Sequence, residues 1–254
     1  MVMNFIPVVA AVWGMIFLFS ETFFMKTLIM RTQIIYILSM VVGSLNILNL
    51  YSDDVAMKIL KYEDFSKGAG EWEPTDNGAW QVKGDGDNTV YALVKKHSSY
   101  KPPHRSPLNI ALLKDIEVTD FEMTVRLRST SEPYNHQSLC LFFGYQDPEH
   151  FYYVHFGKKT DDHANQIFIV NEAPRTKISR TTTPGTPWDD QWHIVRIRRE
   201  VDSGLIEVFF DDLKIPVMQA VDHNFQWGRV GIGSFDDPGN FDEFLLMGHR
   251  KDVP

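Results

Sequence analysis

From residue 62 onward, short runs of apolar residues alternate with polar residues. Residues 121–128 alternate strictly, so Phe121, Met123, Val125 and Leu127 share one face of an extended strand. Clusters of Gly, Pro, Asp and Asn separate these runs, which is typical of turns between strands. No apolar stripe with helical spacing continues for more than about two turns in this part of the chain. The pattern therefore predicts an all-β domain without the crossover helices of a parallel sheet.

The clearest strands are expected in pairs around turns. Predicted strands 139–145 and 151–156 flank a turn at 146–150, strands 192–199 and 205–211 flank 201–204, and strands 230–235 and 241–247 flank 236–240. A further short strand is expected at 166–170. Residues 98–107 contain three prolines and predict a long loop over one end or face. A sandwich of two antiparallel sheets accommodates all of these elements.

The first fifty residues have a different pattern. Between residues 1 and 51 the only charged side chains are Glu21, Lys26 and Arg31. The apolar segment 4–24 is long enough to cross a bilayer, because about 20 apolar residues span its core. The segment 34–50 follows Lys26 and Arg31 and is typical of a secretory signal, so Met25 is an alternative initiator to Met1.

These features predict the domain organisation. We expect residues 1–51 to be a hydrophobic signal peptide or membrane anchor, formed by export or anchor helices, and residues 61–249 to be the β-sandwich domain. The protein would then be exported, and its location would be periplasmic, extracellular or membrane-anchored, with membrane contact through an uncleaved N-terminal segment. Two true transmembrane helices are the alternative.

Composition narrows the classes of function. The chain has 254 residues and a formal net charge of −8, which argues against a nucleic-acid partner because phosphates require a Lys and Arg excess. Its hydrophobic content of 44% excludes disorder of the whole chain. Cys140 is the only cysteine, so an intrachain disulfide and a cysteine-rich zinc site are both excluded.

Several short motifs resemble a known fold family. They are Tyr62-Glu63-Asp64-Phe65-Ser66, Phe142-Phe143-Gly144-Tyr145-Gln146-Asp147, Phe151-Tyr152-Tyr153-Val154, Glu207-Val208-Phe209-Phe210-Asp211, Gly231-Ile232-Gly233 and Phe241-Asp242. In this order they resemble the concanavalin A-like jelly roll, and within it the LamG-like and 3-keto-disaccharide hydrolase branch of secreted bacterial carbohydrate-active proteins. The resemblance implies that the first strand pairs near the last and that the other sheet forms a concave face that accepts glycans.

Tyr153 and His155 are the candidate catalytic residues. They are two apart in one predicted strand and therefore share a face. Jelly-roll polysaccharide lyases use His and Tyr to move protons and Arg or Gln to neutralise a uronate carboxylate. Retaining glycosidases of this fold carry paired carboxylates on one strand, and no predicted strand of this chain carries such a pair. The same residue types also form an ordinary sugar-binding face, and His155 also fits a structural role.

Other polar residues nearby are candidates for ligand binding. They belong to the proline-rich loop, to the segments before and after the strand of Tyr153, and to the segment near residue 176: His104, Arg105, His136, Gln137, His163, Asn165, Gln166, Arg175 and Lys177. Loops on a rigid sandwich often carry the residues that recognise a ligand. The alternative is that these residues belong to solvated loops without a role in binding, because such loops have a similar composition.

Calcium is the only cofactor that the sequence indicates. The resemblance places Asp64 near Asp242, and two carboxylates with backbone carbonyls would give the oxygen ligands that Ca²⁺ prefers. The alternative is that both aspartates cap turns.

Among the tryptophans, we expect Trp80 and Trp192 in the core and Trp188 exposed as a sugar platform. We expect Arg196, Arg198 and Arg199 to form a solvated strand face.

These observations predict an exported jelly-roll domain that recognises a poly- or oligosaccharide on its concave sheet. One alternative is an enzyme, either a lyase that uses Tyr153 and His155 or a keto-sugar-type glycoside hydrolase. A second alternative is a cell-surface module that binds proteins and no glycan.

Overall fold

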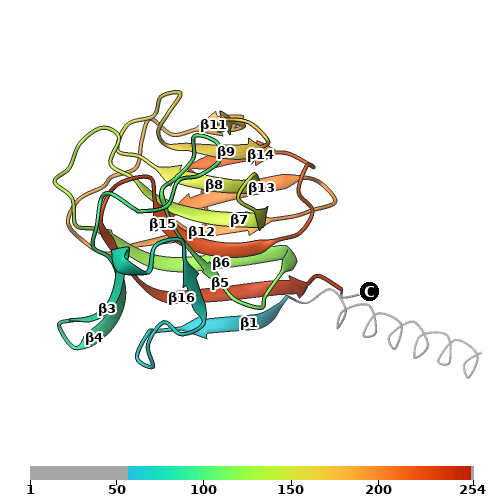
Figure 1. The fold of residues 1–254 in the computed structure, drawn as a ribbon. Coiled ribbons are helices and arrows are strands. Elements are labelled where there is room, and N and C mark those ends of the chain that lie inside the picture. The colour runs from blue at the N-terminus through green and yellow to red at the C-terminus, as the bar shows by residue number, and fades with distance from the viewer. Residues whose placement is uncertain (1–56, 253–254) are drawn as a thin grey trace, which may run out of the picture. The chain divides into compact units, whose positions relative to one another are not determined.

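Two antiparallel β-sheets pack face to face in the computed structural model of the protein (Figure 1). The structure describes residues 57–252, which form one compact unit. The predicted signal peptide or anchor at 1–51 lies outside the described residues and stays a prediction. No helix within 57–252 has the length and apolar character needed to cross a membrane.

The larger sheet has nine strands. In spatial order they are β11 (Thr181–Thr182), β14 (Met218–Val221), β13 (Leu205–Phe210), β12 (His193–Arg199), β6 (Val118–Ser129), β16 (Gly239–Arg250), β4 (Asn88–Leu93) and β3 (Trp80–Asp85), and β1 (Lys58–Glu63) pairs with β16. In Figure 1, β1 lies beside β16 at the lower edge of the sandwich. The register pairs Glu63 with Phe244, so the predicted pairing of the first strand near the last is confirmed.

The smaller sheet has seven strands. Its order is β10 (Thr176–Lys177), β9 (Gln166–Asn171), β8 (His150–Phe156), β7 (Leu139–Asp147), β15 (Arg229–Ser234), β5 (Asn109–Leu113) and β2 (Trp72–Pro74), and the 3-10 turn η1 (Asn77–Ala79) precedes β3. All pairings in both sheets are antiparallel, and the predicted jelly-roll sandwich is confirmed.

Alternation along β6 places one face in the core between the sheets. Phe121, Met123, Val125 and Leu127 are buried there, as the sequence predicts. Two of the three predicted strand pairs are hairpins, β7 with β8 and β12 with β13, and the turn between β7 and β8 is tighter than the pattern indicated. The third pair, β15 and β16, is present as two strands, but the turn between them connects the two sheets. β5 was missed because all five of its residues are buried, so no alternation marks it in the sequence.

A second apolar cluster covers the outer face of the seven-stranded sheet. Its members are Ile110, Leu112, Cys140, Phe142, Tyr145, Phe151, Tyr153, Phe168 and Val170. The loop between β4 and β5, here called the roof loop (residues 94–108), makes contacts around this cluster. The carbonyl of Arg105 accepts a hydrogen bond from the amide of Arg175, and the amide of Leu108 donates to the carbonyl of Phe235. The predicted loop over one face is therefore confirmed.

Two tryptophans exchange the places that the sequence predicted. Trp188 is 2% exposed, and its indole N–H donates to the carbonyl of Phe156 over 2.9 Å, so the prediction of an exposed platform is wrong. Trp192 comes immediately before β12 and is half-buried, and the centroid of its ring lies 5.2 Å from the guanidinium carbon of Arg126 and 5.0 Å from that of Arg128. Trp80 is in the core as predicted.

The alternation of inward and outward side chains along β12 explains why Trp192 is not in the core. His193 and every second residue after it point inward, so Trp192 must point outward. The same parity buries Arg199, which was predicted to be solvated. Its guanidinium donates to the carbonyls of Gly204 and Phe225 over 2.6 and 3.2 Å.

The different burial of Trp188 and Trp192 predicts that their replacement by alanine lowers the free energy of unfolding by different amounts. Trp188→Ala should lower the free energy of unfolding by about 3 to 5 kcal/mol, because it removes a large buried side chain and leaves a cavity. Trp192→Ala is the matched control and should cost about 1 kcal/mol or less, since it removes cation–π contacts at a half-exposed site. Urea unfolding of the two variants measures the difference. Equal costs would contradict the assigned burial.

Candidate functional site

Tyr153 and His155 both lie on β8 on the outer face of the seven-stranded sheet, whereas Val154 and Phe156 lie in the core between the sheets. The shared face is therefore as predicted. Neither side chain is open to solvent, because Tyr153 is 0% and His155 is 3% exposed.

Polar neighbours hold both side chains in place. The Tyr153 hydroxyl accepts a hydrogen bond from Nη1 of Arg175 over 2.7 Å. Nδ1 of His155 accepts a hydrogen bond from the amide of Asn165 over 3.4 Å, which places the proton of the neutral ring on Nε2. The Arg175 guanidinium also stacks 4.6 Å from the ring of Phe168, so it closes this part of the face.

Burial weakens His155 as a base. Loss of solvation, followed by the charges of Arg175 and His136, lowers the pKa of His155 to about 3. A general base is most effective when its pKa lies near the working pH. Burial likewise raises the pKa of Tyr153. Catalysis by Tyr153 and His155 stays a prediction, and it would require Arg175 to move away from the Tyr153 hydroxyl.

The other candidate residues of this region gather around the loop between β8 and β9. Nε2 of His136 lies 2.5 Å from Oδ2 of Asp161, and Lys177 forms an ion pair with Asp162. Three further hydrogen bonds lie within or beside this loop: Asn165 Nδ2 donates to Thr160 Oγ1 over 2.6 Å, Gln166 Nε2 donates to the carbonyl of Asp161 over 2.8 Å, and the amide of His163 donates to Asp161 Oδ1 over 2.7 Å. Arg175, which follows β9, donates through Nη2 to the carbonyl of His163 over 3.1 Å. The cluster exists as predicted, and most of its polar groups are used to hold the loop.

Three candidate residues lie at the margins of this cluster. Nε2 of His104 lies 3.0 Å from Oε1 of Glu149, which ties the roof loop to the turn between β7 and β8. The guanidinium of Arg105 lies 5.9 Å from the centroid of the Phe235 ring. Gln137 is fully buried, and neither polar atom of its side chain has a hydrogen-bond partner among the described residues.

The two aspartates of the predicted calcium site both accept local hydrogen bonds. Asp64 accepts from the amide and hydroxyl of Ser66, and these bonds lower its pKa. Asp242 accepts from the amide of Glu243, while burial, with the charge of Glu243, raises its pKa. No group of three or more His, Cys, Asp or Glu side chains arranged for a metal ion occurs within residues 57–252. The calcium site remains a prediction.

An open groove of about 420 Å³ lies on the outer face of the seven-stranded sheet and shares no lining residue with the His155 cluster, defined as His136, His155, His163, Asn165, Gln166 and Arg175. It is lined by Glu73, Pro74, Thr75, Tyr100, Leu112, Tyr145, Gln146, Asp147, Pro148 and Arg229. Tyr145 belongs to the outer apolar cluster, and its ring stacks on Phe151 with centroids 5.2 Å apart. Tyr100 comes from the roof loop and is half-buried. The groove therefore combines two aromatic side chains with polar groups on a rigid sheet.

Polar groups in the groove are held in fixed orientations. Arg229 donates through Nε to the carbonyl of Leu113 over 3.0 Å, and its Nη2 lies 2.7 Å from a carboxylate oxygen of Glu73. Gln146 donates through Nε2 to the carbonyl of Trp227 over 3.1 Å, which leaves its Oε1 as an acceptor. These groups can exchange hydrogen bonds with sugar hydroxyls without first being ordered.

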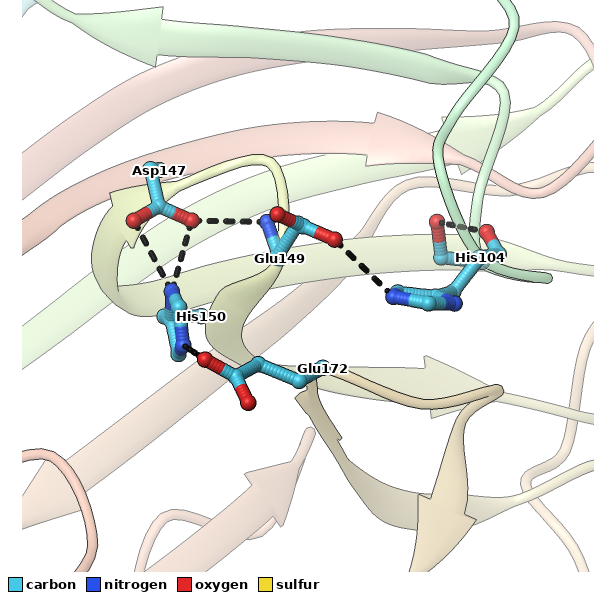
Figure 2. A network of polar contacts seen from close by, with 6 residues as sticks. His104, Asp147, Glu149, His150 and Glu172 are labelled. Atoms are coloured by element: carbon cyan, nitrogen blue, oxygen red, sulfur yellow. Dashed lines mark hydrogen bonds and ion pairs between the residues drawn. The ribbon is translucent and has the colours of Figure 1, made fainter.

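A network of histidines and carboxylates borders the groove at the turn between β7 and β8. Figure 2 shows His150 between Asp147 and Glu172, with Nδ1 of His150 2.8 Å from both oxygens of Asp147 and Nε2 3.4 Å from Glu172. The hydrogen bond and charge of Asp147, supported by Glu172, raise the pKa of His150. The network fixes the position of Asp147 at the groove.

Sequence reasoning missed most of this groove. Tyr145, Gln146 and Asp147 stand in a motif that carried the fold resemblance, but Glu73 and Arg229 come from β2 and β15 and meet only in the folded sheet. Tyr100 lies within the loop that was predicted, and an aromatic residue in that loop was the one available signal.

Comparisons with known proteins describe the fold. No protein family and no curated protein matches the chain by sequence. Among solved structures, the fourth domain of an extracellular arabinanase from Geobacillus stearothermophilus, solved with arabinotriose, has a TM-score of 0.50 and 12% identity over 77% of this chain and 95% of its own. The basic winged bean lectin, solved with Tn antigen, has a TM-score of 0.50 and 14% identity over 78% of this chain and all of its own (100%). The concanavalin A-like jelly roll is therefore the fold of residues 57–252.

The two β8 histidines should titrate in opposite directions. We expect the midpoint of His150 above its ordinary value of 6.5, and no titration of His155 until the pH approaches about 3. The proton held by folded His150 stabilises the protein below pH 6.5, and this contribution disappears as the pH rises through its raised pKa. For His155 the unfolded chain binds the proton more readily, so its contribution is present above pH 6.5 and falls toward pH 3.

Proton NMR of the imidazole rings across this range measures both midpoints, with His150→Gln and His155→Gln used for assignment. A midpoint of His155 near 6.5 would contradict its burial, and a midpoint of His150 below 6.5 would contradict its pairing with Asp147.

Proposed function

We propose that the protein binds a poly- or oligosaccharide in the groove that Tyr100 and Tyr145 line on the outer face of the seven-stranded sheet. The observation that carries this proposal is the combination, in one open groove, of aromatic rings with fixed donors and acceptors. Sugar sites need both, because apolar ring faces of the sugar pack on aromatic side chains while hydroxyl groups exchange hydrogen bonds.

The chemistry of the groove supports binding rather than hydrolysis. Most glycosidases use a protonated carboxylic acid beside a second carboxylate. Glu73 is paired with Arg229. Burial opposes ionisation of Asp147, but hydrogen bonds from the Glu149 amide and from His150 outweigh burial and lower its pKa. Asp147 is therefore poorly suited to protonate a leaving group near neutral pH, and it has no second carboxylate paired with it for catalysis in the groove lining, where Glu73 contacts Arg229.

Two further observations agree with a glycan ligand. The arabinanase domain was solved with arabinotriose and the lectin with Tn antigen, so this fold presents sugar ligands in other proteins. The hydrophobic segment 1–51 is typical of an export signal or anchor, which would place the domain where extracellular or periplasmic glycans occur.

Removal of the loop tyrosine tests the proposal. Tyr100→Ala should weaken binding about tenfold or more in affinity electrophoresis against a panel of neutral polysaccharides, because aromatic anchors contribute more than 1 kcal/mol at such sites. Tyr62→Ala is the matched control, since Tyr62 is 56% exposed on β1 in the other sheet. Unchanged retention of Tyr100→Ala, with normal unfolding behaviour, would contradict binding in the groove.

The enzyme alternatives are tested on the same panel by following products. We expect neither ultraviolet-absorbing unsaturated ends nor new reducing ends. Unsaturated ends that disappear in Tyr153→Phe would establish the lyase alternative instead. Reducing ends alone would establish hydrolysis, and absence of any glycan retention would favour the protein-interaction alternative.

A further inference from the structure

A second hollow adjoins the groove on the other side of one ion pair. It has a volume of about 460 Å³ and shares Glu73 and Arg229 with the groove. Its other charged lining residues include Lys114, Arg250 and Lys251. Because the same ion pair lines both spaces, a ligand longer than one sugar residue can extend from the groove into the hollow.

The cations of the hollow differ in how they are paired. Arg229 is paired with Glu73 at 2.7 Å, and Lys251 is paired with Glu117 at 3.3 Å. The other two cations, Lys114 and Arg250, have no carboxylate within ion-pair distance among the described residues. Both are exposed.

Backbone carbonyls orient these two cations. The ammonium of Lys114 donates to the carbonyl of Gly70 over 2.8 Å, and Nη1 of Arg250 donates to the carbonyl of Asp115 over 3.2 Å. A carbonyl partner fixes the position of a cation without neutralising its charge, so the remaining N–H groups are available to an anionic ligand.

The two spaces differ in local charge. The hollow has four cations, Lys114, Arg229, Arg250 and Lys251, against the three carboxylates Glu73, Asp115 and Glu117. The groove instead has two carboxylates, Glu73 and Asp147, against Arg229. The field within a cleft depends on its own lining, so the acidic net charge of the chain does not prevent an anion from binding in the hollow.

We infer that the hollow is a second subsite, which binds an anionic substituent, a carboxylate or sulfate group, on a sugar residue next to the one in the groove. Lys114 and Arg250 make the charged contacts, and Arg229 separates the two subsites. This inference rests on the proposed binding of a glycan in the groove and adds the class of glycan to it.

Matched glycans that differ only in charge test the inference. The probes are oligogalacturonides and their fully methyl-esterified forms for the carboxylate, and a sulfated galactan oligosaccharide with its desulfated form for the sulfate. We expect the full chain to bind the charged form of at least one pair about fivefold more tightly, as expected for partly exposed charge contacts. This preference should decrease as salt is added, because exposed charges are screened.

Variants locate the preference. Lys114→Gln combined with Arg250→Gln should reduce the preference to near unity and leave retention on neutral glycans unchanged, whereas Lys83→Gln, an exposed change on β3, should keep it. A preference that persists in the double variant would overturn the subsite.

The outcomes separate this inference from the proposed function. Binding of neutral glycans with no preference for either charged probe overturns the subsite and leaves the groove intact. Loss of binding to neutral glycans in Tyr100→Ala, with the charge preference removed in the double variant, supports both. Failure to retain any neutral or charged glycan overturns both together.

Discussion

The packing of the roof loop on the outer face of the seven-stranded sheet decides which part of that face a ligand can reach. Arg105 of the loop contacts Arg175 and Phe235, and Arg175 in turn lies against Tyr153 and Phe168 of the outer apolar cluster. Such a cover stabilises the sheet, because both of its faces then bury apolar surface. At the end of the sheet where Tyr145 lies, the cover ends and the groove begins. The same loop therefore closes one part of the face and supplies Tyr100 to the part that stays open.

The fold could be predicted where one face of a strand is buried and the other solvated. β6 and β12 alternate in that way, and their strands were found from sequence. β5 is buried on both sides, so its apolar run gave no period from which to infer a face. The apolar neighbours of Trp192 favour the core, whereas the parity of β12 places this side chain outward. The loop position of Trp188 favours exposure, whereas its indole N–H bonds to the carbonyl of Phe156 on β8, a contact with a strand distant in sequence.

The candidate site was predictable only in part, for a different reason. Two of the predicted groupings are present: Arg175 contacts Tyr153, and Asn165, in the loop after β8, contacts His155. The sequence does not show that these polar side chains bond mainly to one another and to the backbone of the loop between β8 and β9, which depends on the folded geometry of that loop. The groove combines residues of four strands and this loop, so no short motif describes it. Its ion pair, Glu73 with Arg229, arises only from the pairing of β2 and β15 with β5.

Amide hydrogen exchange of the full chain, with and without the glycan it retains most strongly, is the most direct test of where that glycan binds. Binding in the groove predicts added protection in β2, around Tyr100 and in the turn between β7 and β8, because these segments line the groove. Segments 134–137 and 158–165, around the His155 cluster, should be unchanged. Protection confined to those two segments, or to the outer face of the nine-stranded sheet, would contradict the groove as the binding site.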